Sequence, residues 1–257
     1  MQWSENAWPE LTHLASPAPG TEHVGLVPVG AVEQHGPHLP TGTDTIVATA
    51  VCNAAADLCD AIVLPAISIG CSYGHGTVLP GTLSLSPELL AQVIRQYAEW
   101  AAISGLKRLL FINAHFGNAA AIGIATDHLR LFRPDLRVGT VNWWDSHPDV
   151  LAAITADGDD IHANKGETSV LMAIAPELVH LDRLADADDE DRTGDLVFRY
   201  TAPALSTNGV TGRPSEATNE LGEQLLAMAA QAIADRVVHG RSEQPPIGIA
   251  PVPHLTA

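Results

Sequence analysis

The sequence is poor in cysteine, and the cysteines that it has are unevenly placed. Its 257 residues include three, Cys52, Cys59 and Cys71. An odd and sparse set without paired spacing argues against a disulfide framework and favours a reducing compartment, so we expect a cytoplasmic protein. Cys52 and Cys59 lie seven positions apart on a predicted helix, and we interpret them as small apolar residues of the core.

Basic residues are also scarce. Thirteen Lys and Arg stand against 30 Asp and Glu, which gives a formal net charge of −17. Because so acidic a surface repels phosphate groups, nucleic acid and anionic membranes are excluded as partners. No run of eighteen or more apolar residues occurs, so we expect no transmembrane helix. The first residues lack a basic segment followed by an apolar one, so we expect no secretory signal.

What the sequence does contain is the composition of a folded protein, with 46% hydrophobic and 17% charged residues. Short apolar runs at 24–30, 61–67, 108–113 and 137–144 alternate with helical patterns at 45–59, 86–105, 118–132, 166–177 and 219–240. Ser86 and Gly105 are typical of the two ends of the clearest helix. The alternation predicts an α/β fold with a mostly parallel central sheet and helices on both faces. We expect one domain over residues 1–257, with a core at about 20–240 and an extended tail at 241–257.

Polar residues with metal-binding or hydrogen-bonding side chains follow each predicted strand. In a parallel sheet, ligand sites form beyond the carboxyl ends of the strands, so these residues are expected at one edge of the sheet. They are Glu33, His35, His38 and Asp44 after the first strand, Ser72, Tyr73 and His75 after the second, Asn113, His115 and Asn118 after the third, and Trp144, Asp145, His147, His162 and Glu167 after the fourth. This recurrence, more than any one motif, predicts a site there.

The stretch GAVEQHGPHLPTGTDT (30–45) is the strongest local signal. Glu33 and His35 are two apart, so in an extended segment their side chains point the same way. The glycines and prolines that follow can turn the chain and return Asp44 to the same place. Nitrogen and carboxylate donors of this kind suit zinc, manganese or iron, and a carboxylate can bridge two ions. From this stretch alone, the alternative that these residues hydrogen-bond a polar loop stays open.

The other candidates also have structural interpretations. His115 ends an apolar strand and Glu167 begins a helix, where a histidine or a carboxylate often serves as a cap. Trp143 and Trp144 are adjacent, so on an extended strand one would enter the core and the other would line a pocket. His75 lies among glycines, which allow the chain to approach a ligand closely.

Four segments resemble the creatininase family of metal-dependent amidohydrolases. They are PVGAVEQHGPHLPTGTDT, PGTLSLSPELL, NAHFGN and HANKGETS, in the order and spacing of the family, and the resemblance runs from about Val24 to Glu177. The resemblance implies a three-layer α/β/α fold, a homohexamer and two divalent ions at the C-terminal ends of the strands. It also implies a set of metal ligands in which Asp44 bridges the ions: Glu33, His35, Asp44 and His115.

The chain departs from creatininase itself at two places. The second residue after His115, an acidic ligand in that enzyme, is Gly117 here, so the resemblance makes Glu167 the fifth ligand. His162 would then protonate the leaving nitrogen or act as an orienting group, and the resemblance makes His162 and Glu167 the catalytic pair. The usual HAGE reads HANK, so Asn164 and Lys165 are expected to alter the pocket wall. The residues expected to bind substrate are Ser72, Tyr73, His75, Phe116 and Trp144.

These inferences together predict a metal-dependent amidohydrolase. A water activated by two zinc, manganese or iron ions would attack the amide carbonyl of a small molecule, and a C–N bond would break. The substrates of the family include a cyclic amide, a formamide and a short peptide, and Gly117 places the chain nearer the latter two. Two other classes of function stay open: a metal-dependent lyase or isomerase that uses the same ions, and a non-catalytic metal-binding scaffold.

Overall fold

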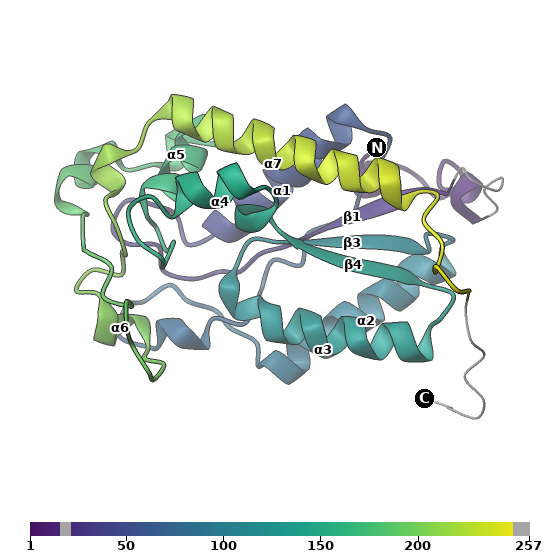
Figure 1. Cartoon of the computed structure of the whole chain (residues 1–257), viewed down its shortest axis with the longest axis horizontal. Helices are drawn as coiled ribbons and strands as arrows, with labels where there is room; N and C mark the ends of the chain where they lie inside the picture. The colour runs from purple at the N-terminus through teal and green to yellow at the C-terminus, as the bar shows by residue number, and fades with distance from the viewer. Residues whose placement is uncertain (16–21, 249–257) are drawn as a thin grey trace.

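A parallel sheet forms the centre of the computed structural model, which describes residues 1–15 and 22–248 (Figure 1). Within those residues the sheet has four strands in the order β2-β1-β3-β4, namely β1 (Val24–Val29), β2 (Ile62–Val63), β3 (Arg108–Asn113) and β4 (Arg137–Asn142). β1 pairs with β3 along its whole length, and all six residues of β1 are buried. A strand that is covered on both faces has no reason to alternate apolar and polar residues, which explains its apolar sequence.

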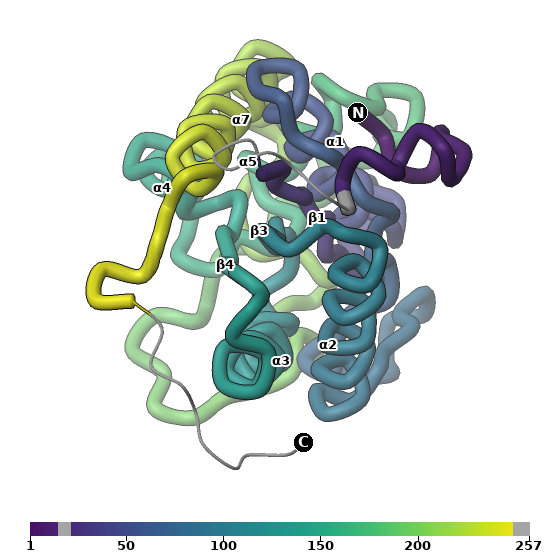
Figure 2. The backbone as a smooth tube through the Cα atoms, turned by 90° about the vertical axis from the view of Figure 1, so that its right-hand side faces the viewer, coloured from purple at the N-terminus to yellow at the C-terminus, as the bar shows by residue number. Residues whose placement is uncertain are grey.

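Helices cover both faces of the sheet, as the sequence predicted (Figures 1 and 2). The helices of one layer are α1 (Thr43–Leu58), α4 (Pro148–Ile154), α5 (Lys165–Ile174) and α7 (Asn219–Gly240). The opposite layer consists of α2 (Pro87–Ile103) and α3 (Ala119–Phe132). Phe111 and Ile112 are neighbours on β3, yet each belongs to the apolar cluster of a different layer. The fold is therefore a three-layer α/β/α arrangement.

Three of the predicted strands are shorter in the structure, the first of them only by residue 30. β2 stops after Val63, and Ile67 forms an isolated bridge with Val29. Pro65 lies between them and has no N–H to donate, so a continuous ladder over 61–67 is not possible. The fourth strand ends at Asn142 instead of 144, because Trp143–Asp145 forms a 3-10 helix.

The ends of the chain also differ from the expectation. Leu14 is fully buried in the core, which therefore begins before residue 20, and Gln2 forms a bridge with Val63 beside β2. In the described part of the tail, the N–H of Gly248 donates to the carbonyl of Pro245, so this part turns instead of extending. Residues 249–257 of the predicted tail lie outside the described residues. No helix of the described chain is long and apolar enough to cross a membrane.

The fold brings the carboxyl ends of the strands, and the loops that follow them, to one edge of the sheet. Asn118 holds three of these loops together. Its Oδ1 accepts from the N–H of Cys71 at 2.9 Å, and its Nδ2 donates to the carbonyl of Gly30 at 3.0 Å. The segment after β2 is thereby tied to the segments after β1 and β3. This one amide fixes the distance between loops that are far apart in the sequence.

Candidate metal centre

The loop between β1 and α1 provides the first three candidate ligands. The N–H of Glu33 donates to the carbonyl of Thr41 at 2.8 Å, and this bond closes the loop on itself. Gly36 has φ +63°, a left-handed conformation that favours glycine, at the point where the chain turns back. Glu33, His35 and Asp44 are all buried as a result, and Asp44 lies in the first turn of α1, where the helix dipole favours a carboxylate.

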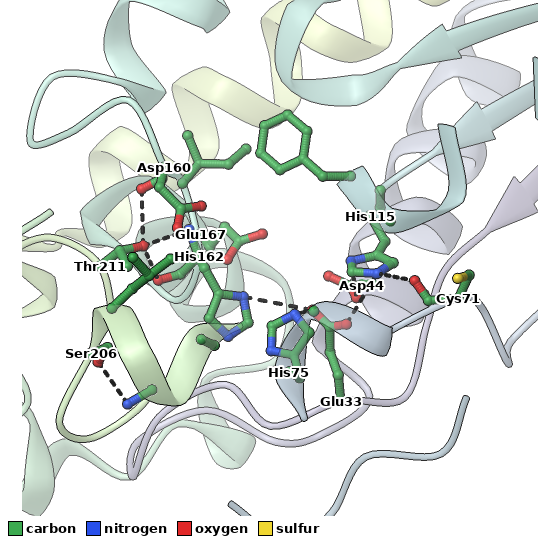
Figure 3. Close-up of a pocket in the computed structure, with 18 of the residues that line it drawn as sticks. Glu33, Asp44, Cys71, His75, His115, Asp160, His162, Glu167, Ser206 and Thr211 are labelled. Carbon is green, nitrogen blue, oxygen red and sulfur yellow. Dashed lines mark hydrogen bonds and ion pairs between the residues drawn. The ribbon is translucent and has the colours of Figure 1, made fainter. Parts of the chain in front are cut away.

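Asp44 lies between His35 and His115, which come from the segments after β1 and β3; Figure 3 shows Asp44 beside His115. Its Oδ1 is 3.2 Å from Nε2 of His35, and its Oδ2 is 3.6 Å from Nδ1 of His115. On the His115 side, Nε2 of His115 is 3.2 Å from Oε2 of Glu33. On the His35 side, Nε2 of His35 is 3.8 Å from Oε2 of Glu167. The structure therefore brings together all five side chains expected as ligands, with Asp44 in the position of a bridge.

The donor atoms of this cluster fit divalent cations. Glu33 Oε1 and Oε2, His35 Nε2 and Asp44 Oδ2 are buried and make no hydrogen bond with any described residue. Unpaired buried polar atoms are costly, so four of them at one place indicate a missing common partner. His35, Asp44 and Glu167 offer ligand atoms within 4.8 Å of one another, as do Glu33, His75 and His115. Mixed imidazole and carboxylate donors suit zinc, manganese and iron.

The pKa values of the buried groups also fit a site for cations. Burial lowers the pKa of His35, but the carboxylates of Asp44, Glu167 and Glu33 outweigh burial and raise this pKa to about 10. Burial raises the pKa of Glu167 to about 8, with Asp44 adding to the effect and His35 opposing it. The buried carboxylates therefore favour a positive partner, and a divalent cation would supply the charge that protons otherwise provide.

Gly117, two residues after His115, has no room for a side chain. A Cβ atom at Gly117 would lie 2.0 Å from the carbonyl oxygen of Cys71 and 2.4 Å from Nε2 of His115. The same carbonyl of Cys71 lies 2.9 Å from His115 Nε2. The space beside His115 is therefore filled by main chain, and any side chain at 117 would displace the histidine.

Glu167 reaches the centre from the start of α5. Asn164 caps this helix, because its side chain accepts from the N–H of Glu167 at 3.0 Å. The N–H of Ala163 donates to Oε2 of Glu167 at 2.7 Å, and Ala163 has the left-handed φ of 52°. Asn164 is fully buried behind the site and Lys165 lies 3.3 Å from Glu216, so neither lines the pocket. The expectation that these two residues alter the pocket wall is wrong.

Two further histidines lie against the same carboxylate. His75, expected at the substrate, has Nε2 at 3.1 Å from Oε1 of Glu33. His162, expected as the general acid, has Nδ1 at 3.6 Å from the same oxygen. Figure 3 shows both rings directed toward Glu33. Burial, and then the neighbouring His35 and His75, hold the pKa of His162 well below its usual range.

The remaining predicted residues divide between the pocket and its surroundings. Phe116 and Trp144 line the pocket, with ring centroids 4.3 Å apart, while Trp143 is fully buried in the core. Ser72 is buried beside His115, 3.4 Å from its Nε2, and does not line the pocket. Tyr73 is 60% exposed and lies outside the pocket lining. His38 is buried and bonded to Thr168 at 2.8 Å, so it joins the loop to α5 and is not a ligand.

Some residues of the site and of its pocket carried no signal in the sequence. Gln34 is buried beside His75 and His162. Unlike its sequence neighbours Glu33 and His35 it has no charge, so its side chain gave no reason to expect it there. Tyr200, Ser206 and Thr211 close the pocket from a long loop that contains the short helix α6 (Ala202–Leu205). This loop has neither periodicity nor a metal-binding motif. Side chains alternate in an extended segment, so the sequence could have predicted that Gln34 points away from Glu33. No such pattern predicts the positions of Tyr200, Ser206 and Thr211.

Comparisons with known proteins place the chain among related sequences and structures. The family model described as "Creatininase: Creatinine amidohydrolase" matches residues 4–237. The chain is 31% identical over 236 residues to the creatinine amidohydrolase of Pseudomonas putida, covering 86% of this chain and 90% of that one. It is 36% identical over 222 residues to the mycofactocin precursor peptide peptidase of Mycolicibacterium smegmatis (strain ATCC 700084 / mc(2)155), covering 82% and 83%.

The fold is also similar to solved creatininase structures. A creatininase variant described as the Zn-Zn type superposes with a TM-score of 0.80 at 31% sequence identity, covering 93% of this chain and 97% of that one. The family match spans most of the sequence, and both catalogued relatives are similar over more than four fifths of their own length. The chain therefore belongs to the creatininase family and is a hydrolase of carbon–nitrogen amide bonds.

Proposed function

We propose that this chain is a metal-dependent amidohydrolase that holds two divalent cations, one on each side of Asp44. The observation that carries the proposal is the pair of distances from Asp44 Oδ1 to His35 and from Asp44 Oδ2 to His115. Glu167 would complete the His35 side, and Glu33 the His115 side. Zinc, manganese and iron all match this donor set, and the Zn-Zn type of the related creatininase supports zinc.

The chemistry follows from the position of the pocket over these residues. Divalent cations held there would polarise an amide carbonyl and lower the pKa of water, in general from about 15.7 toward roughly 7. His162 lines the same pocket, and its low pKa keeps the ring neutral, so that one ring nitrogen can accept a proton. This nitrogen would take a proton from the attacking water and pass it to the amine as the C–N bond breaks.

The substrate is proposed to be a small amide. The pocket is lined by Phe116 and Trp144 on one side and by Asp160, Ser206 and Thr211 on another, so it offers an apolar wall and polar groups to one ligand. A cyclic amide, a formamide and the end of a short peptide would all fit this description. The names of the two relatives support a choice between creatinine and a peptide as the first substrates to test.

Assembly into a homohexamer is the second part of the proposal. Leu89, Trp100 and Ile103 are 46%, 68% and 69% exposed on α2, and exposed apolar side chains of this size support association between copies. Light scattering coupled to size exclusion would give the mass directly. A monomeric mass would remove this part of the proposal and leave the proposed activity unaffected.

The decisive experiment combines metal analysis with product analysis. Purified protein is expected to contain about two divalent ions for each chain, and to release acid and amine in equal amounts from creatinine, a formamide or a short peptide. Isomerisation or elimination without uptake of water would instead support a lyase or an isomerase. A protein that binds metal but converts no amide, and that keeps its biological role as Asp44→Ala, would be a scaffold.

The role of His162 is tested by His162→Gln, with His239→Gln as the matched control. His239 is 80% exposed on α7, far from the pocket lining, so its replacement should change nothing. His162→Gln should retain metal and lose roughly 100- to 10,000-fold in kcat, the usual contribution of a positioned acid or base. Wild-type turnover by this variant would show that another group carries the proton.

A further inference from the structure

Asp188, Asp189 and Asp191 lie on one extended segment, and their side chains do not all face the same way. The main chain of Asp189 forms an antiparallel bridge with that of Gly212, and in an extended segment alternate side chains share a side. Asp189 is 7% exposed and Asp191 is half-buried, whereas Asp188 is exposed. The two inward carboxylates therefore need hydrogen-bonding partners inside the chain.

The carboxylate of Asp189 ties together the two ends of a loop. Its Oδ2 accepts from Oγ of Ser206 at 3.0 Å, and from the N–H and the hydroxyl of Thr207 at 2.7 and 2.9 Å. Its Oδ1 accepts from Nη1 of Arg192 at 2.6 Å, and the same Nη1 donates to the carbonyl of Leu205 at 3.1 Å. The chain between these contacts therefore leaves and returns at one carboxylate.

The carboxylate of Asp191 holds a second segment. Its Oδ2 accepts from the N–H of Asp159 at 2.8 Å and from the N–H of Asp160 at 3.1 Å. Its Oδ1 accepts from the N–H and the hydroxyl of Thr193 at 2.8 and 2.6 Å. All four carboxylate oxygens of Asp189 and Asp191 thus accept hydrogen bonds, so these side chains bind other parts of the chain.

Both carboxylates are ionised at neutral pH. Burial raises the pKa of Asp189, but the hydrogen bonds that it accepts, those from Thr207 first, outweigh burial and hold this pKa at about 2. Burial also raises the pKa of Asp191, and the bonds from Thr193, Asp160 and Asp159 outweigh it and hold this pKa below its usual value. Hydrogen bonds to an ionised acceptor are stronger than those between neutral groups, so each carboxylate holds its segment firmly.

The two held segments form one wall of the pocket. Asp160 and Ser206 line the pocket, and Figure 3 shows both on the side away from His115. The hydroxyl of Thr211 donates to the carbonyl of Asp160 at 3.0 Å, so the two segments contact each other. Tyr200 adds to the wall from within the closed loop. The wall therefore depends for its position on two carboxylates that lie outside the pocket lining.

We propose that Asp189 and Asp191 are positioning residues, which hold the 159–160 segment and the 200–211 loop in place as a preformed wall of the substrate pocket. The proposal rests on the proposed function in one respect, namely that this pocket binds the amide. When a wall is in place in only a fraction of the molecules, the apparent affinity for substrate falls by that fraction. Loss of either carboxylate should therefore raise KM.

The activity test uses Asp189→Asn and Asp191→Asn, which keep the size of the side chain and remove its charge. An asparagine can turn its one oxygen to only one set of donors, so part of each contact is lost. A hydrogen bond to a charged group is worth roughly tenfold or more in an equilibrium constant, so KM should rise roughly tenfold in each variant. Asp189→Asn should keep kcat and metal content within about twofold, because only the wall is displaced.

Asp188→Asn is the matched control. Asp188 is an exposed neighbour on the same segment, and its carboxylate accepts from the N–H and the hydroxyl of Ser215 at 2.9 and 2.6 Å. Ser215 does not line the pocket. The control removes the same charge and a similar pair of hydrogen bonds, and it should keep KM within about twofold of wild type.

The second readout is hydrogen exchange of zinc-loaded protein without substrate, measured by mass spectrometry. Amides of residues 193–205 should exchange faster in Asp189→Asn than in wild type, whereas those of α7 should not change. Faster exchange in both places would show a general loss of stability and would count against the proposal. If wild type hydrolyses no amide, the proposed function fails, and the exchange rates still decide whether Asp189 holds the loop.

Three further results would overturn the proposal. One is a pair of folded variants, Asp189→Asn and Asp191→Asn, with the KM of wild type. Another is unchanged exchange over residues 193–205 in Asp189→Asn. The third is an equal rise in KM in Asp188→Asn, which would assign the effect to the charge of the segment and not to the bonds.

Thr207→Val decides if Asp189→Asn fails to fold. It keeps the shape of the threonine and removes one of the bonds to Oδ2 of Asp189. KM should then rise roughly threefold, the usual effect of one hydrogen bond, and residues 193–205 should exchange faster. A folded Thr207→Val protein with the KM and the exchange rates of wild type would overturn the proposal in the same way.

Discussion

Oε2 of Glu167 lies 3.8 Å from Nε2 of His35, and both side chains are almost completely buried. If all three groups were ionised, Glu167 and the neighbouring Asp44 would bring more negative charge than His35 could balance. The pKa of Glu167 is about 8 and that of His35 about 10, so each keeps a proton that it would lose in the unfolded chain near neutral pH. The stability of the metal-free protein must therefore depend on pH.

The direction of this dependence follows from the pKa of each group. Raised pKa values stabilise the fold below the unfolded values, about 4.5 for Glu167 and 6.5 for His35, and this contribution is lost as the pH passes about 8 and about 10. His115, whose pKa the Glu33 and Asp44 carboxylates raise against burial to about 9, behaves in the same way. We predict that the melting temperature of chelator-treated protein falls from about pH 7 to about pH 9.5.

Metal should remove this dependence, because bound cations take the place of those protons. Calorimetric scans with a chelator and with zinc, at the same series of pH values, make the comparison. The zinc-loaded protein should melt at a nearly constant temperature over the same range. A metal-free protein that becomes more stable as the pH rises would contradict the assignment of the buried charges.

Asp44→Asn should remove activity and metal together. The replacement keeps the shape of the side chain and removes the charge that faces both His35 and His115. The loss in kcat/KM should exceed the roughly 100-fold that is typical of residues behind the ligands, and metal content should fall by at least one ion for each chain. Asp57→Asn, on the exposed side of the same helix α1, is the control and should match wild type. Elemental analysis and steady-state kinetics measure both effects.

Gly117→Ala should destabilise the protein and disturb His115. Its Cβ would overlap the Cys71 carbonyl and Nε2 of His115, and overpacking of this kind generally costs about 1–3 kcal/mol. Gly123→Ala is the matched control, since Gly123 is exposed on α3 with nothing within 4 Å of the added atom. That change should be neutral or should stabilise by about 0.5–1 kcal/mol through helix propensity. Equal unfolding free energies for the two variants in urea would show that the main chain around Gly117 shifts to accommodate the added atom.

The sequence predicts the layers of this fold well because its signals are local. The predicted helix 219–240 has the same bounds as α7, and Ser86 caps α2 with a 3.2 Å bond from the N–H of Leu89. β2 was overestimated because burial, not strand pairing, makes 61–67 apolar. Trp143 and Trp144 go to core and pocket as expected, although they do so from a 3-10 helix and not from a strand.

The site was harder to predict because its residues meet through loops. Glu33 and His35 could be paired by alternation along one extended segment, but their distances to His115 and Glu167 depend on two other segments. Gln34 has no charge, so composition gives no reason to place it among histidines. Its position depends in part on a hydrogen bond to Gly209 in the 206–211 loop, which no local pattern connects to residue 34.

Asn164→Ala should cost more stability than the loss of an ordinary helix cap. The side chain caps α5 and also donates to the carbonyl of Ile154 at 2.7 Å and to Oδ1 of Asp157 at 3.0 Å. A cap is worth about 1 kcal/mol, and each buried partner left unpaired adds roughly 1–3 kcal/mol. We therefore expect a loss of at least about 3 kcal/mol in the unfolding free energy.

Ser86→Ala is the comparison that isolates the buried bonds. Ser86 caps α2 with a single exposed bond, so its loss should cost about 0.5–1 kcal/mol in the same urea titration. Because Asn164 also holds the N–H of Glu167, Asn164→Ala should weaken zinc binding, whereas Ser86→Ala should not. If the two variants lose equal stability and bind zinc equally well, the cap of α5 does not position Glu167, and that residue must be held by the N–H of Ala163 alone.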